Sequence, residues 1–90
     1  MSLKQVTDRL RQVILEHNHG FANVPIRELT PCPNDETNDW HLLWMINEIQ
    51  TSETMGLLQC HRWLAFIQGV MVCKHYTTVA IEREETRELL

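Results

Sequence analysis

The fold is decided by residues 40–75, which read WHLLWMINEIQTSETMGLLQCHRWLAFIQGVMVCKH. Apolar side chains occupy most helical faces in both halves of this stretch, and Thr51 and Ser52 interrupt the run between them. A helix that is apolar on most sides is buried on most sides. We therefore predict two apolar helices, over residues 35–50 and 52–75, that pack against each other.

A glycine lies inside the second of these predicted helices, at position 69. Glycine costs about 1 kcal/mol relative to alanine in a helix interior. It is usually kept there because another backbone packs closely against it. The sequence therefore predicts that Gly69 marks a tight crossing of two helices.

A first helix is predicted within residues 1–19, because a capping signal precedes an apolar stripe of helical period. Ser2 followed three residues later by Gln5 has the spacing of a capping box. The stripe consists of Leu3, Val6, Leu10, Val13 and Ile14. The helix is expected to stop before Gly20.

An irregular linker is predicted over residues 20–34, because its prolines forbid a long helix. These are Pro25, Pro31 and Pro33. Within the linker, Asn23 could cap a single helical turn over residues 24–29, and the alternative is an extended edge segment. In either case Val24, Ile26 and Leu29 are expected to contact the core.

A last helix is predicted over residues 78–88, capped by Thr77 or Thr78. Its first turn is expected to be anchored by Val79 and Ile81. The remaining glutamates and arginines of this helix are expected to be solvated. The fold class is therefore all-α: a small bundle of three to four helices with an irregular proline-containing linker after the first helix.

The length of 90 residues is that of a single domain. A domain of this size hides only about 60–65% of the surface that its unfolded chain exposes, so its core is small. Self-association would enlarge the buried area. A homo-oligomer is therefore expected, and a dimer is favoured.

The net charge and the cysteine content limit which binding partners and which cellular compartment fit the sequence. The net charge is −4 and no Lys or Arg cluster is present, so direct nucleic-acid binding is disfavoured. The longest apolar stretch is too short to span a bilayer. Three cysteines without a C-x-x-C pair, and no secretory signal, predict free thiols and a cytoplasmic location.

No catalytic or metal-binding constellation is visible. The histidines lack the spacing of metal-ligand pairs, and both serines fit helix caps. The histidines are His17, His19, His41, His61 and His75. We therefore expect no enzymatic activity, no bound metal and no cofactor.

One group of candidate binding residues follows from His61, Arg62 and Trp63, with Gln68 further along the same predicted helix. Arg and Trp dominate binding hot spots, whereas an arginine in an apolar helix also commonly snorkels to water. Gln68 lies six residues from Arg62, about 600° of helical rotation, which puts the two on opposed sides. A site between subunits could still use both.

A second group of candidate binding residues is Trp40, His41 and Trp44. Trp40 and Trp44 lie one helical turn apart, and such a pair belongs either to the core or to an aromatic ridge for a partner. Both interpretations stay open at this stage.

Several segments resemble a family of short accessory proteins of enterobacterial tailed phages and prophages. The segments are WHLLWMINEI at residues 40–49, RWLAFIQG at 62–69, TTV at 77–79 and ER at 82–83 through Arg87. Ala65 departs from the glycine of the family pattern. The resemblance implies a phage origin and the cytoplasm of an infected bacterium. It further implies a non-structural protein that binds a host protein or sequesters a signalling ligand.

Three functions follow as hypotheses. The first is a non-enzymatic binding module that engages a host or phage protein through an apolar, Trp-bearing helical face. The second is an anti-defence protein that binds a nucleotide-like small ligand, with Arg62, Lys74, His61 and Trp63 at a subunit interface. The third is a structural oligomerisation domain.

Overall fold

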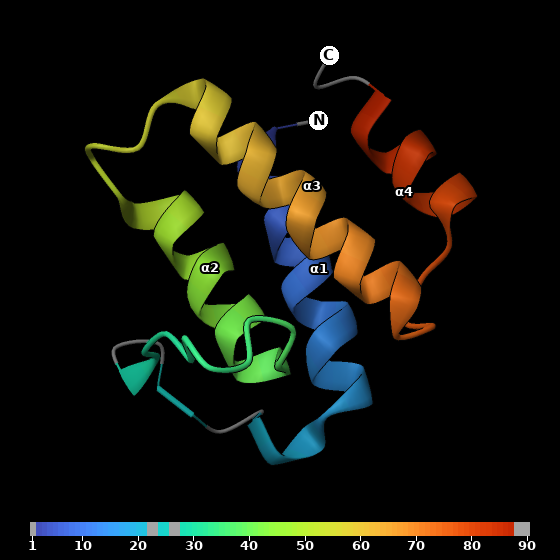
Figure 1. Cartoon of the computed structure of the whole chain (residues 1–90). Coiled ribbons are helices and arrows are strands. Elements are labelled where there is room, and N and C mark those ends of the chain that lie inside the picture. The colour runs from blue at the N-terminus through green and yellow to red at the C-terminus, as the bar shows by residue number, and fades with distance from the viewer. Residues whose placement is uncertain (1, 22–23, 26–27, 88–90) are drawn as a thin grey trace.

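The computed structural model describes residues 2–21, 24–25 and 28–87. Within them the chain is all-helical and contains no strand, as predicted. The α-helices are α1 (Leu3–His17), α2 (Asp39–Thr51), α3 (Leu57–Cys73) and α4 (Val79–Thr86), with a short 3-10 helix η1 (His19–Phe21) after α1. In Figure 1, α3 lies in front of α1, with α2 on one side and α4 on the other.

The predicted caps of the first and last helices are confirmed. The Ser2 hydroxyl accepts from the Gln5 N–H at 3.1 Å, and the Gln5 side chain accepts from the Ser2 N–H at 2.8 Å, which completes the capping box. The Thr78 hydroxyl accepts from the Ile81 N–H at 3.2 Å. These side chains satisfy N–H groups that a helix start leaves without partners.

The two central helices are shorter than predicted. Helix α2 begins at Asp39 rather than at residue 35, because Asn38 provides the cap by accepting from the Trp40 N–H at 2.8 Å. Helix α3 begins at Leu57 rather than at residue 52, because the Ser52 side chain accepts hydrogen bonds within the turn that follows α2. Helix α3 ends at Cys73, two residues before the positive φ of His75.

The linker between α1 and α2 is irregular, as predicted. The Glu28 N–H donates to the Pro25 carbonyl at 2.9 Å, a hydrogen bond that favours the predicted turn over an extended segment. Val24 and Leu29 are half-buried. Asn23 and Ile26, to which the sequence assigned a cap and a core contact, lie outside the described residues.

The core is a single apolar cluster to which the first three helices contribute. Its members are Val6, Leu10 and Ile14 of α1, Leu42, Leu43, Met45, Ile46 and Ile49 of α2, and Cys60, Leu64, Ile67 and Met71 of α3. The α1 residues are spaced by four, so they form one buried stripe. The predicted packing of two apolar central helices is therefore confirmed, with α1 completing the core.

Helix α4 corrects the prediction for the last helix. Val79 is 56% and Ile81 is 48% exposed, so neither anchors the first turn, whereas Glu82 is only 5% exposed. The Glu82 carboxylate pairs with Arg9 of α1 and accepts from the Gln68 amide at 3.0 Å and the Thr77 hydroxyl at 2.6 Å. The helix is therefore attached through its polar side, because three donors meet the buried charge.

A second buried carboxylate joins the start of α2 to the residues after α3. Asp39 accepts from Lys74 Nζ at 2.7 Å, Tyr76 Oη at 2.7 Å and Asn18 Nδ2 at 3.3 Å. Burial of the carboxylate raises the pKa of Asp39, but the hydrogen bonds from these three donors outweigh it and hold the pKa below the ordinary value of 3.8. Asp39 is therefore a buried charge that joins the start of α2 to the residues that follow α1 and α3, at one end of the bundle.

Gly69 does not mark a helix crossing within the described residues. A Cβ built on Gly69 meets no atom within 4 Å, and the residue is exposed. The predicted reason for a glycine at this position is therefore wrong for the single chain. The space beside it is open.

Candidate functional site: an aromatic groove between two helices

A pocket of about 390 Å³ lies between α2 and α3 and brings most of the predicted binding residues together. We call it the aromatic groove. It is lined by Glu36, His41, Trp44, Met45, Arg62, Trp63 and Phe66. A volume of this size lies within the range of about 300–1,000 Å³ that is typical of ligand pockets.

The spacing of residues along α2 and α3 determines which side chains form the walls of the groove. Trp44 and Met45 follow His41 by three and four residues, so all three project from one side of α2. On α3, Phe66 follows Trp63 by one turn. The ring centroids of Trp44 and Trp63 are 5.6 Å apart, a separation typical of interacting aromatic pairs, and this contact joins the two helices.

His41 is held in place as part of the wall. It is buried, its ring lies 5.3 Å from that of Trp44, and its Nδ1 accepts from the Cys32 N–H at 3.0 Å. A nitrogen that accepts this bond carries no proton, so the neutral ring has its proton on Nε2. The linker therefore fixes the orientation of His41 from outside the groove.

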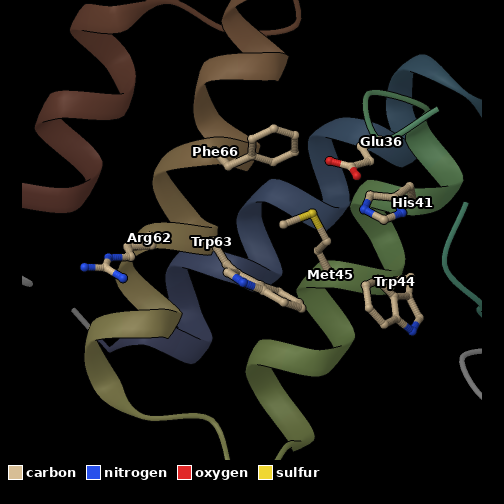
Figure 2. A pocket seen from close by; sticks show the side chains of 7 residues that line it. All are labelled: Glu36, His41, Trp44, Met45, Arg62, Trp63 and Phe66. Atoms are coloured by element: carbon tan, nitrogen blue, oxygen red, sulfur yellow. The ribbon is translucent and has the colours of Figure 1, made fainter. Parts of the chain in front are cut away.

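The two charged side chains of the groove lie at its margins. Figure 2 shows the Arg62 guanidinium pointing away from the aromatic rings, while Glu36 lies beyond Phe66, on the side of His41. Arg62 is exposed, which matches the snorkelling interpretation of an arginine in an apolar helix. The floor between the two charges is apolar, formed by Met45 and the aromatic side chains.

The structure brings four of the seven predicted binding residues into the groove: His41, Trp44, Arg62 and Trp63. Trp40 lies elsewhere: its ring packs edge-on against Phe21 at 5.5 Å, and its Nε1 donates to Thr30 at 3.4 Å. Gln68 faces α4 and donates to Glu82. His61 is half-buried and does not line the groove.

Sequence reasoning missed Glu36, Met45 and Phe66. The position of Phe66 one turn after Trp63 was a usable signal, because residues at that spacing share a helix face. Met45 adjoins Trp44 in sequence, but its apolar character suits the core equally well. Glu36 carried no signal, since it lies in a loop whose path depends on the tertiary fold.

Lys74 is not free to join this site. Its ammonium group lies 2.7 Å from the buried Asp39 carboxylate and outside the aromatic groove. Lys74 instead lines a neighbouring pocket of about 500 Å³ together with Thr37 and Phe66. Lys74 is therefore separate from Arg62 in the single chain, and the nucleotide site predicted at a subunit interface, with Arg62, Lys74, His61 and Trp63, stays a prediction.

Within the described part of the chain, no three His, Cys, Asp or Glu side chains are placed to hold a metal ion. Over the same residues, no helix is long and apolar enough to cross a membrane. The groove itself offers aromatic faces, a thioether and two charged side chains at its margins.

No family model, no curated protein and no solved structure matches this chain. The resemblance to phage accessory proteins stays a prediction.

Proposed function

We propose that this protein is a non-catalytic binding module that holds an apolar segment of a protein partner in the aromatic groove. One observation carries the proposal: two tryptophans, a phenylalanine and a methionine from two helices line an open pocket with charges only at its margins. Aromatic residues, methionine and arginine are the types enriched at protein interfaces.

The shape of the groove suits a helical segment. A groove between two helices accepts an amphipathic helix whose apolar side chains, one turn apart, enter the pocket. Glu36 and Arg62 at the two margins would orient that helix, because its charged flanks must meet opposite charges. In an infected bacterium, the setting implied by the phage resemblance, the partner is a host or phage protein.

The charge distribution favours a protein over a nucleotide-like ligand. Arg62 is the one basic side chain of the groove, and Glu36 repels phosphate. Lys74 is already paired with Asp39. A nucleotide would find aromatic faces for stacking but little to neutralise its phosphates.

Capture from bacterial lysate with three immobilised forms tests the proposal. The forms are wild type, Trp63→Ala as the groove variant, and Leu57→Ala as a control whose side chain is 70% exposed outside the groove. We expect a protein that is recovered by wild type and Leu57→Ala and lost with Trp63→Ala. Circular dichroism must show that the groove variant stays helical.

A direct measurement completes the test. The purified partner should change the tryptophan fluorescence of the wild type, because Trp44 and Trp63 both line the groove. Recovery of the same proteins by all three forms would contradict the proposal. So would a nucleotide that raises the melting temperature while no protein binds, since a ligand of the folded state must stabilise it.

A further inference from the structure

Aromatic rings make up much of the wall of the aromatic groove. Two indole rings, a phenyl ring and an imidazole ring line it, those of Trp44, Trp63, Phe66 and His41. The Trp44 ring is inclined by 42° to the rings of Trp63 and His41, so these rings do not stack face to face. Trp44 and Trp63 are half-buried and Phe66 is 38% exposed, so a ligand can reach the rings from solvent.

The face of an aromatic ring attracts a cation. Its π electrons give the face a partial negative charge, and a cation within about 6 Å of the ring centre is stabilised. The Trp44 centroid lies 5.6 Å from that of Trp63 and 5.3 Å from that of His41. One cationic group beside Trp44 is therefore within reach of more than one ring.

A carboxylate stands at the margin of the same groove. Glu36 lies beyond Phe66, on the side of His41 (Figure 2). This carboxylate takes part in none of the ion pairs formed by the described residues. Arg62, the basic side chain of the groove, points its guanidinium away from the rings (Figure 2). The Glu36 end of the groove therefore favours a positive charge.

The hydrogen-bonding groups of the groove favour an ammonium group that has no N–H donors. A lysine ammonium carries three donors, and each needs an acceptor when it leaves water. Nδ1 of His41 already accepts from the Cys32 N–H at 3.0 Å, and the indole nitrogens only donate. Among the side chains that line the groove, Glu36 is then the one strong acceptor. A quaternary ammonium group has no donor to satisfy and contacts the rings through its methyl groups.

The size of the groove and the charge of the chain suit such a group. The pocket volume is about 390 Å³, whereas one water molecule takes up about 30 Å³ of the liquid. A nitrogen with three methyl groups therefore fits. The net charge of −4 adds a long-range attraction for cations.

We propose that the aromatic groove binds a quaternary ammonium group, which contacts the rings of Trp44, Trp63 and Phe66 and lies beside the Glu36 carboxylate. A free small compound and a trimethylated lysine of a protein both carry this group. The inference goes beyond the proposed function, because the groove can take the group without an apolar helical segment.

NMR titration of the indole N–H groups in the full chain tests the site with two probes of the same shape. The probes are choline and the alcohol in which a carbon atom replaces the choline nitrogen. Choline should shift the signals of Trp44 and Trp63 but not that of Trp40, which packs against Phe21 outside the groove. Choline should bind about 5-fold or more tightly than the neutral alcohol, because the ring faces attract only the cation.

Two results of this titration would overturn the proposal. Equal affinity for the two probes would show that the groove is only apolar. No shift in the signals of Trp44 and Trp63 at about 100 mM choline would show that the groove does not take the group. Neither result would count against the proposed protein partner, because capture from lysate tests that partner separately.

Glu36→Gln tests the carboxylate. The change keeps the shape of an exposed loop side chain, so the fold should survive. The affinity for choline should fall by about 3-fold or more, and the affinity for the neutral alcohol should not change. Glu53→Gln is the matched control, because it removes the same charge at an exposed position outside the groove. Equal losses in the two variants would indicate an effect of net charge alone and would contradict the placement beside Glu36.

Two lysine derivatives extend the test to the source of the group. The N-acetyl amide of trimethyllysine should bind more tightly than that of lysine, because the lysine donors lack acceptors in the groove. Equal affinity of the two derivatives would contradict the proposal. Tighter binding of the trimethyllysine derivative than of choline assigns the group to a methylated protein, and the reverse order assigns it to a free compound.

Discussion

Helices α1 and α4 are attached to the rest of the bundle in opposite ways. Helix α1 contributes Val6, Leu10 and Ile14, each without exposed surface, to the apolar core. Helix α4 exposes its apolar side chains and buries Glu82 instead. Apolar burial supplies most of the stability of a fold, whereas a buried charge must be met by several donors that offset its loss of hydration. The contrast shows how α4 is positioned while its apolar surface stays available beside α3.

The largest effect is expected from Leu42→Ala, which removes a fully buried side chain from the apolar core. We expect it to lower the free energy of unfolding by about 2–5 kcal/mol, since the cavity adds to the lost burial. Leu57→Ala, at an exposed position, should change it by less than about 0.5 kcal/mol. Denaturant titration measures both, and comparable losses in the two variants would contradict the core assignment.

The next effect is expected at the polar attachment of α4. Glu82→Gln keeps the shape of the side chain but leaves Arg9 without its buried partner, so we expect a loss of about 2–3 kcal/mol. The matched control is Glu84→Gln, because Glu84 pairs with Arg87 at the surface with both side chains largely exposed. That change should cost less than about 0.5 kcal/mol.

Hydrogen exchange locates the loss in the Glu82→Gln variant. Amides of α4 should exchange faster, while those of α2 and the buried side of α3 should keep their protection, because the apolar core does not depend on Glu82. Uniform loss of protection across all helices would show that α4 is part of the same cooperative unit as the core. That result would contradict the inference that α1 and α4 are attached to the bundle in different ways.

A smaller effect is expected at the second buried carboxylate. The pKa of Asp39 is lowered in the folded state, so its charge stabilises the fold above pH 3.8, and that contribution is lost as the pH falls through the folded value. Asp39→Asn should therefore be less stable than wild type at neutral pH, by about 1–3 kcal/mol. The difference should shrink below pH 4. A difference that stays constant with pH would contradict the ion pair with Lys74.

The smallest effect is expected in the titration of the single tyrosine. Its hydrogen bond to Asp39, aided by burial, raises the pKa of Tyr76 from 10.0 to about 12. A group with a raised pKa stabilises the folded state fully below its unfolded value and loses that effect as the pH rises from about 10 to about 12. Tyrosinate absorbance should therefore develop near pH 12 in wild type and nearer pH 10 in Asp39→Asn.

Sequence periodicity predicted the apolar half of the molecule well. The stripe of α1, the apolar faces of α2 and α3, and both capped helix starts follow from residues within a few positions of one another. The linker was predicted from its prolines. The helix starts at Asp39 and Leu57 were missed, because several residues in the preceding loops are equally good caps.

The polar half could not be predicted in this way. Glu82 in a run of charges and Asp39 in a helix first turn both resemble solvated residues that favour the macrodipole. Their partners are distant in sequence: Arg9 lies 73 positions from Glu82, and Lys74 lies 35 positions from Asp39. Only the tertiary fold brings these groups together.

The candidate site was predicted in part for the same reason. The spacing of Arg62 and Gln68 indicated different sides of one helix, and the structure confirms this, since Gln68 faces α4. The pairing of Trp44 with Trp63 depends on how α2 and α3 cross. No periodicity within one helix contains that information.

The central claim is that apolar surface left over from the core, between α2 and α3, is a binding site for a protein partner, the aromatic groove. Phe66 lines this groove without contributing to the tryptophan fluorescence that reports on it. Titration with the partner recovered from bacterial lysate should change the tryptophan fluorescence of wild type, and Phe66→Ala should weaken this binding by about 10-fold or more. Equal affinity of the two proteins for the partner would contradict the account.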